Sequence, residues 1–184
     1  MKDAGIDDAA LVEQCRKGNT RAFDELVGKY QKTLFNVALR MTGEYDAAEE
    51  VTQLAFVKAY ERLASFDPKY KFFSGLYRIL VNGAVDLIED RKKHERLTAQ
   101  HASDDPGPAE TEEREDHEAV LQEGLMQLTA GQRAIIILRH FQDMTYKEIG
   151  GVLDIPEKTV KSRLFSARLQ LRQILVRKGL RFHE

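Results

Sequence analysis

The sequence predicts an all-α protein made of two small helical domains joined by a flexible acidic linker. Apolar residues recur at three- and four-residue steps in both halves of the 184-residue chain, which is the spacing of amphipathic helices. No stretch alternates apolar and polar residues for long enough to indicate a sheet. Between the halves lies an acidic segment with Asp-Asp-Pro-Gly-Pro and no large apolar residue, a composition typical of linkers.

The distribution of charge supports the same division. Residues 97–115 hold one basic and six acidic side chains, residues 116–184 hold 11 basic and 8 acidic ones, and residues 1–96 are balanced. The formal net charge of -2 is therefore an average over unlike parts, and it does not exclude nucleic-acid binding. We place the N-terminal domain at 1–96, the linker at 97–117 and the C-terminal domain at 118–184.

Three helices are expected in the N-terminal domain. The first is long and amphipathic from Phe23, with Asn19 before it and Gly43 after it as caps. The second covers about 46–63 and the third about 72–90. The residues of the second helix that we expect to face inward are Val51, Leu54, Ala55, Ala59 and Leu63.

Helix starts in the C-terminal domain are marked by two capping boxes, Thr129-Ala-Gly-Gln132 and Thr145-Tyr-Lys-Glu148. Pro156 suits the first turn of a further helix. In that helix one apolar stripe is expected to be core, formed by Val160, Leu164, Ala167, Leu171 and Leu175. The order is a short helix, a tight turn and a longer helix.

This helix-turn-helix is the strongest functional signal. Lys158, Lys161, Ser162, Phe165 and Arg168 fall largely off the apolar stripe, and nine basic against four acidic residues follow position 144. Such a second helix fits the DNA major groove, where long basic chains reach phosphates and guanine edges. The competing interpretation is a helical hairpin with a solvated charged face.

A second signal is the segment 66–78, in which aromatic and basic residues are interleaved. Exposed rings stack on unpaired bases while cations hold the backbone, so this composition suits single-stranded nucleic acid or a base extruded from a duplex. The alternative is that the rings are core, and we expect two or three of the five to be buried. The segment's rings and cations are Phe66, Tyr70, Phe72, Phe73, Tyr77, Lys69, Lys71 and Arg78. Asn82 follows on the same side of the helix as Lys71 and Arg78.

The outward side of the second helix is a weaker candidate. Glu49, Glu50, Gln53 and Val57 form a mixed acidic and apolar surface that could dock a partner helix, although a charged outer face needs no partner. The sequence contains no arrangement of nucleophile and base, no phosphate-binding glycine loop and no cluster of metal ligands, so we expect neither an enzyme nor a cofactor.

The chain also indicates its compartment. Cys15 is the single cysteine and cannot form an internal disulfide, which fits a reduced compartment. No apolar run is long enough to span a membrane, and the acidic first ten residues do not resemble a signal peptide. We expect a cytoplasmic protein without membrane insertion.

Taken in order, four stretches resemble the small extracytoplasmic-function (ECF) group of bacterial RNA polymerase sigma factors, within the sigma-70 family. They are AFDELVGKYQKTLFNVALRMTG, DAAEEVTQLAFVKAYERLASFD, FFSGLYRILVNGAVDLI and LTAGQRAIIILRHFQDMTYKEIGGVLDIPEKTVKSRLFSARLQLR. Each is degenerate alone, but four in the correct order are specific and cover nearly the whole chain.

The resemblance implies a non-enzymatic factor that directs promoter-specific initiation. It implies that the N-terminal domain recognises and melts the promoter -10 element, through Phe66, Tyr70, Lys71, Phe72, Tyr77, Arg78 and Asn82. It implies that the C-terminal domain reads the -35 element, through Lys158, Thr159, Lys161, Ser162, Phe165 and Arg168. Glu49, Glu50, Gln53 and Val57 would then bind the clamp coiled coil of the largest catalytic subunit of core RNA polymerase, and an anti-sigma factor would hold the protein inactive.

Three positions depart from the family's pattern. Gly75 stands where Trp is usual, so the aromatic wall of the melting region must depend on Phe72, Phe73 and Tyr77. Leu54 replaces a common acidic residue, which changes one polymerase contact. Ser166 replaces a frequently basic residue, so the -35 preference of relatives cannot simply be transferred.

Two other classes of protein remain as alternatives at this stage. One is a helix-turn-helix regulator whose N-terminal bundle dimerises or senses a ligand, which leaves the segment 66–78 as core. The other is a helical protein-interaction adaptor, which would show no salt-dependent DNA binding.

Overall fold

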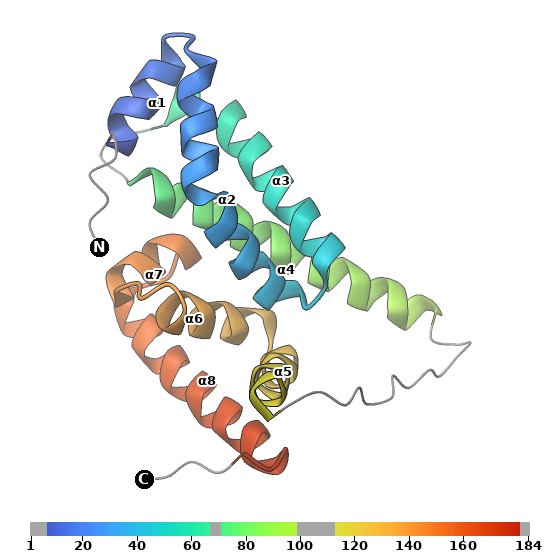
Figure 1. The fold of residues 1–184 in the computed structure, drawn as a ribbon. Coiled ribbons are helices and arrows are strands. Elements are labelled where there is room, and N and C mark those ends of the chain that lie inside the picture. Colours follow the sequence, from blue (N-terminus) through green and yellow to red (C-terminus); the bar gives the residue numbers. More distant parts are fainter. Residues whose placement is uncertain (1–6, 67–70, 99–112, 181–184) are drawn as a thin grey trace.

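The structure, a computed structural model, describes residues 7–66, 71–98 and 113–180. In these residues every regular element is a helix, which confirms the predicted all-α class (Figure 1). The elements are α1 (Asp8–Arg16), α2 (Thr20–Thr42), α3 (Tyr45–Glu61), the 3-10 turn η1 (Leu63–Ser65), α4 (Phe72–Thr98), α5 (Glu113–Met126), α6 (Ala130–His140), α7 (Tyr146–Leu153) and α8 (Glu157–Arg177).

The N-terminal domain is built on α2, which packs against α1, α3 and α4. Gly43 ends α2 in the left-handed conformation, with φ 78°, and donates a hydrogen bond of 2.8 Å to the carbonyl of Leu39, so the predicted C-cap is confirmed. Asn19 does occupy the N-cap position, but its side chain makes no capping bond and donates instead to Gln14 at 3.1 Å. The largest fully buried side chains of this domain are Leu26, Leu34, Met41, Leu76 and Leu80.

One expectation about α3 is wrong. Val51, Ala55 and Ala59 are buried as predicted, but Leu54 is 46% exposed. Adjacent residues of a helix lie about 100° apart around its axis, which takes Leu54 out of the face that Ala55 buries. Leu54 therefore belongs to the outer face of α3.

The C-terminal domain follows the predicted helix starts closely. Both capping boxes are formed, with the Gln132 amide donating to Thr129 Oγ1 at 3.3 Å and the Glu148 amide donating to Thr145 Oγ1 at 3.2 Å. Pro156 is the N-cap of α8, one position before the first turn in which it was expected. The whole predicted apolar stripe of α8 is buried: Val160, Leu164, Ala167, Leu171 and Leu175.

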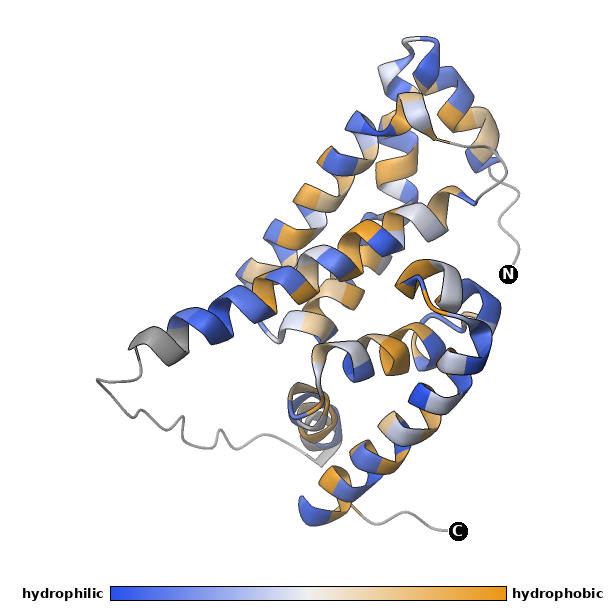
Figure 2. Ribbon diagram, turned by 180° about the vertical axis from the view of Figure 1, so that it is seen from behind, coloured by the Kyte–Doolittle hydropathy of each residue, from blue (hydrophilic) through white to orange (hydrophobic). Residues whose placement is uncertain are grey.

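Helices occupy both ends of the segment expected to be the linker. α4 continues to Thr98 and α5 begins at Glu113, while residues 99–112 lie outside the described part of the chain. The end of α4 consists mostly of hydrophilic residues (Figure 2). α5 packs against α8 at Gly124, where a Cβ atom would lie only 2.8 Å from Leu175 Cδ2, so a glycine allows this close approach.

The two domains pack against each other in two places. α4 lies against α7, and the C-terminal end of α2 meets α5 and α6 (Figure 1). At the second place, the Arg40 guanidinium lies 4.0 Å from the centre of the Phe141 ring and pairs with Glu118 at 2.9 Å. The -10 and -35 candidates are thereby held in one compact arrangement.

Arg133 of α6 joins three chain segments at that second contact. It is buried, and its guanidinium donates to the carbonyls of Leu125 and Met126, both at 2.8 Å, to that of Leu128 at 3.3 Å, and to that of Met41 in α2. Loss of hydration lowers the pKa of Arg133, yet a guanidinium stays protonated and suits the negative ends of two helices.

Candidate nucleic-acid and partner interfaces

The turn between α7 and α8 is tight because of a glycine. A Cβ atom on Gly150 would lie 2.8 Å from the carbonyl oxygen of Ile155, so only glycine lets the turn fold back this closely onto α7. The Ile155 amide donates to the Gly150 carbonyl at 3.1 Å, and Asp154 adopts the left-handed conformation with φ 55°. This turn sets the angle at which α8 leaves α7.

The predicted reading face of α8 is open to solvent. Phe165 is 71% exposed, which is unusual for a ring of its size. Thr159 is half-buried, and its carbonyl accepts a hydrogen bond of 3.1 Å from the Ser162 hydroxyl. The fully exposed residues of the predicted set are Lys158, Lys161, Ser162, Phe165 and Arg168. The structure thus brings five of the six candidates onto one exposed surface.

Two cations of this face are oriented by neighbouring helices. Lys161 pairs with Glu157 at 3.3 Å and lies 5.6 Å from the ring centre of Tyr146 in α7. Arg168 Nε donates to His140 Nε2 of α6 at 3.0 Å. Burial, followed by the charges of Arg168 and Arg139, lowers the pKa of His140 and keeps its ring neutral, as an acceptor must be. Tyr146 and His140 were not singled out from the sequence.

The aromatic and basic segment divides into buried rings and exposed cations. Phe72 and Tyr77 are 5% and 4% exposed, and Phe66 and Phe73 are half-buried, which agrees with the expectation that two or three rings are core. Phe72 meets Phe66 edge-on at 6.0 Å between ring centres. Tyr70 lies outside the described residues. Lys71, Arg78 and Asn82 are exposed, as their shared side of the helix predicted.

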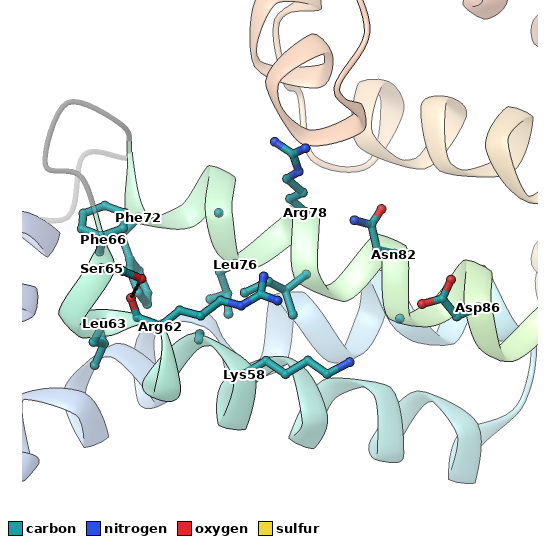
Figure 3. Close-up of a pocket in the computed structure, with 14 residues that line it drawn as sticks. Lys58, Arg62, Leu63, Ser65, Phe66, Phe72, Leu76, Arg78, Asn82 and Asp86 are labelled. Atoms are coloured by element: carbon teal, nitrogen blue, oxygen red, sulfur yellow. Dashed lines mark hydrogen bonds between the residues drawn. The ribbon is translucent and has the colours of Figure 1, made fainter.

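A pocket of about 710 Å³ opens between α3 and α4, and four of the -10 candidates line it (Figure 3). Its floor is aromatic and aliphatic, and its rim is polar and basic. Lys58 and Arg62 of α3 also line it, opposite Asn82, and sequence reasoning missed them. Their spacing of four residues at the end of an amphipathic helix was the available signal. The four predicted residues are Phe66, Phe72, Arg78 and Asn82.

Three of the -10 candidates contact the C-terminal domain. Lys71 donates to Glu148 at 2.9 Å, the Tyr77 hydroxyl donates to Gln142 at 2.8 Å, and Arg78 donates to Asp154 at 2.7 Å. The guanidinium of Arg78 therefore points away from the pocket toward the ribbon of α7 (Figure 3). The hydrogen bond from Lys71, together with those from Thr145, lowers the pKa of Glu148.

The outer face of α3 carries the predicted partner surface. Glu49, Glu50, Gln53 and Val57 are all exposed, and Gln53 Nε2 donates to Glu49 Oε1 at 3.4 Å. The exposed Leu54 adds a second apolar side chain next to Val57. The face combines acidic groups with aliphatic contact area, which suits a basic or mixed partner surface.

Two further features bear on function. Among the described residues, no three His, Cys, Asp or Glu side chains are grouped so that they could hold a metal ion. Nor does any helix in the described ranges combine the length and apolarity that crossing a membrane requires.

Comparison with known families gives two matches along the chain. Residues 26–94 match the description "Sigma-70 region 2", and residues 118–171 match "Sigma-70, region 4". The first match covers most of α2, α3 and α4 with the pocket between them, and the second covers the helix-turn-helix.

Individual relatives agree with this division over most of their length. The chain is 34% identical over 173 residues to the RNA polymerase sigma-H factor of Pseudomonas aeruginosa, covering 88% of this chain and 90% of that one. It is 31% identical over 176 residues to the ECF RNA polymerase sigma factor SigW of Bacillus subtilis, with coverage of 89% and 94%. The solved structure of CnrH in complex with the cytosolic domain of CnrY superposes with a TM-score of 0.72 at 27% identity, over 91% of this chain and 96% of that one.

Proposed function

Since this chain belongs to the ECF group of the sigma-70 family of RNA polymerase sigma factors, we propose that it binds core RNA polymerase and directs initiation at specific promoters. Members of this family are transcription initiation factors, not enzymes. We place the protein in the cytoplasm, where it meets the polymerase. The division of labour proposed below assigns one task to each of the three surfaces.

The C-terminal domain reads the -35 element in the major groove. The support is that α8 buries one stripe completely and exposes Lys158, Lys161, Ser162, Phe165 and Arg168 on the other side. Lysine and arginine reach phosphates and guanine edges, and an exposed ring fits a thymine methyl group. Thr159, half-buried beneath this face, contributes through its contact with Ser162.

The N-terminal domain captures the melted -10 element. An extruded base needs an apolar or aromatic floor with polar groups at the rim, and the α3–α4 pocket offers Phe66 and Phe72 below Asn82. Lys58, Arg62, Lys71 and Arg78 supply positive charge for the strand's phosphates, and Tyr77 and Tyr70 supply further rings for stacking.

The outer face of α3 binds the clamp coiled coil of the largest catalytic subunit. Glu49, Glu50 and Gln53 offer polar contacts, and Val57 with Leu54 offers apolar area. We also propose an anti-sigma factor as a regulatory partner, because CnrH, which shares this fold, was solved with the cytosolic domain of CnrY.

One observation carries this proposal against an ordinary helix-turn-helix regulator. A regulator needs only α7 and α8, whereas this chain also has an aromatic pocket with basic and amide groups at its rim, on a separate domain. A duplex-binding regulator has no use for such a pocket.

The decisive experiment is transcription in vitro with core polymerase on a library of promoters. We expect a restricted set of promoters, each with a defined start site that depends on the added protein. Random start sites would contradict the proposal. A stable free dimer that does not co-migrate with core polymerase in gel filtration would favour the regulator.

The division of labour is tested with matched substitutions. Asn82→Ala should impair promoter opening, detected by permanganate at unpaired thymines, and leave the -35 preference intact. Lys161→Ala should do the reverse, because its side chain lies on α8. Equal loss of both properties in each variant would contradict the assignment.

A further inference from the structure

The contacts between α4 and the C-terminal domain fall on the residues proposed to hold the -10 strand. Lys71 pairs with Glu148, Tyr77 is hydrogen-bonded to Gln142, and Arg78 pairs with Asp154. Each contact joins an N-terminal side chain assigned to DNA with a polar side chain of the other domain. The remaining domain contacts, around Arg133 and Arg40, lie at the far end of α2.

These contacts exclude DNA on chemical grounds. A carboxylate and a phosphate bind the same guanidinium or ammonium, so Glu148 and Asp154 occupy the positions that strand phosphates would need at Lys71 and Arg78. Tyr77 is 4% exposed, and a ring must be open on one face to stack on a base. In this arrangement the -10 surface is covered by the protein's own acidic groups.

The other two proposed surfaces stay open in the same arrangement. Glu49, Glu50, Gln53 and Val57 on α3 are exposed, as is the reading face of α8 with Phe165. The contacts therefore cover one of three surfaces, and polymerase can engage α3 while the -10 residues are still held.

We propose that Glu148, Gln142 and Asp154 form an autoinhibitory latch over Lys71, Tyr77 and Arg78, which must open before the protein takes single-stranded promoter DNA. The latch rests on the proposed -10 role of these three residues. It also explains how a protein with an open basic helix avoids holding unpaired DNA before polymerase arrives.

The latch is weak enough to open. The two ion pairs are partly exposed, with side-chain accessibilities of 68% and 25% for Lys71–Glu148 and of 45% and 77% for Arg78–Asp154. Exposed pairs contribute little each, so removing both carboxylates should shift the equilibrium between closed and open forms by roughly threefold to tenfold. Salt should shift it in the same direction, because it screens exposed pairs.

Two substitutions remove the charges and keep the local structure. Glu148→Gln keeps the capping box, which accepts glutamine, and Asp154→Asn keeps the left-handed turn, which asparagine tolerates. The matched control is Glu123→Gln with Asp143→Asn. It removes the same charge from the same domain, Asp143 is the other left-handed aspartate, and Glu123 pairs with Lys178 inside the domain.

The experiment measures the distance between the domains in the full-length chain. Spin labels at Glu25→Cys and Gln173→Cys, both exposed positions, with Cys15→Ser, give the distance distribution by electron–electron resonance. We expect one short-distance population in the otherwise unmodified chain and in the control. Glu148→Gln/Asp154→Asn should add a long-distance population that grows with salt less steeply than that of the control.

The second readout is binding of a fluorescent single-stranded DNA of mixed sequence. The latch variant should bind it roughly threefold to tenfold more tightly than the control, by anisotropy. An unchanged distance distribution overturns the latch, and so does a shifted distribution with unchanged DNA affinity. Failure to bind core polymerase would contradict the proposed function instead, and the distance measurement does not depend on it.

Discussion

The hydroxyl of Tyr77 in α4 donates a hydrogen bond of 2.8 Å to the side-chain oxygen of Gln142, so the C-terminal domain meets a ring of the N-terminal domain. These residues are 65 positions apart in the chain. Burial raises the pKa of the Tyr77 phenol from 10.0 to about 12. Its ionisation therefore reports whether the ring is covered.

The first prediction concerns this titration. Because burial favours the neutral phenol, Tyr77 stabilises the closed form fully below pH 10.0, and this contribution is lost as the pH rises through about 12. The tyrosinate absorbance of the unmodified protein minus that of Tyr77→Phe should show a midpoint near 12. In Glu148→Gln/Asp154→Asn the midpoint should move toward 10. A midpoint near 10 in the unmodified protein would show that the ring is solvated.

A second prediction follows from the four carbonyls bound by Arg133. Arg133→Lys should lower the free energy of unfolding by about 2–4 kcal/mol, because one ammonium cannot reach acceptors spread around a planar guanidinium, and buried carbonyls lose their donors. Urea denaturation measures the change as a lower midpoint at an unchanged slope. Arg177→Lys, at an exposed position in the last turn of α8, is the control and should change stability little. Equal stability of the two variants would contradict the role of Arg133.

Local signals account for the parts of the fold that the sequence predicted well. A capping box depends on residues three apart, and a helical stripe depends on steps of three and four. Thr129, Thr145, Gly43 and the α8 stripe could therefore be interpreted without knowledge of the tertiary structure. Leu54 was misplaced because apolar character alone does not say which side of a helix is covered.

Contacts between distant segments could not be predicted in the same way. Arg78 and Asp154 are 76 positions apart, and no periodic pattern links them. Arg133 looked like a surface residue because its charge hides the carbonyls that it binds. Gly124 resembled a helix breaker within α5, although it allows Leu175 to approach. The candidate site residues were identified by composition, but their division into held and open surfaces depends on packing.

A third prediction concerns Gly43, which has a positive φ and lies against α5. An alanine there would adopt a left-handed conformation at a cost of about 1–2 kcal/mol, and its Cβ would lie 2.8 Å from Met126 Sδ. Gly43→Ala should lower the midpoint of thermal unfolding. Gly28→Ala is the control, because Gly28 lies inside α2 with nothing within 4 Å of its Cβ position, and it should stabilise by about 0.5–1 kcal/mol. A stabilising Gly43→Ala would contradict the left-handed cap.

The last prediction separates phosphate contacts from base contacts on α8. Lys158 is exposed in the first turn, so Lys158→Ala should weaken binding of -35 duplex uniformly across sequences and reduce the slope of log affinity against log salt by about 0.9. Phe165→Ala should instead leave the slope unchanged and relax the preference at one base pair, because its ring carries no charge. Arg177→Ala, in the last turn of the same helix, is the control for loss of one positive charge and should change neither property. Both binding variants should keep the stability of the unmodified protein, since neither side chain is buried. A reduced slope for Phe165→Ala, or an equal reduction for Arg177→Ala, would mean that affinity reflects the overall charge of the helix and not a defined reading face.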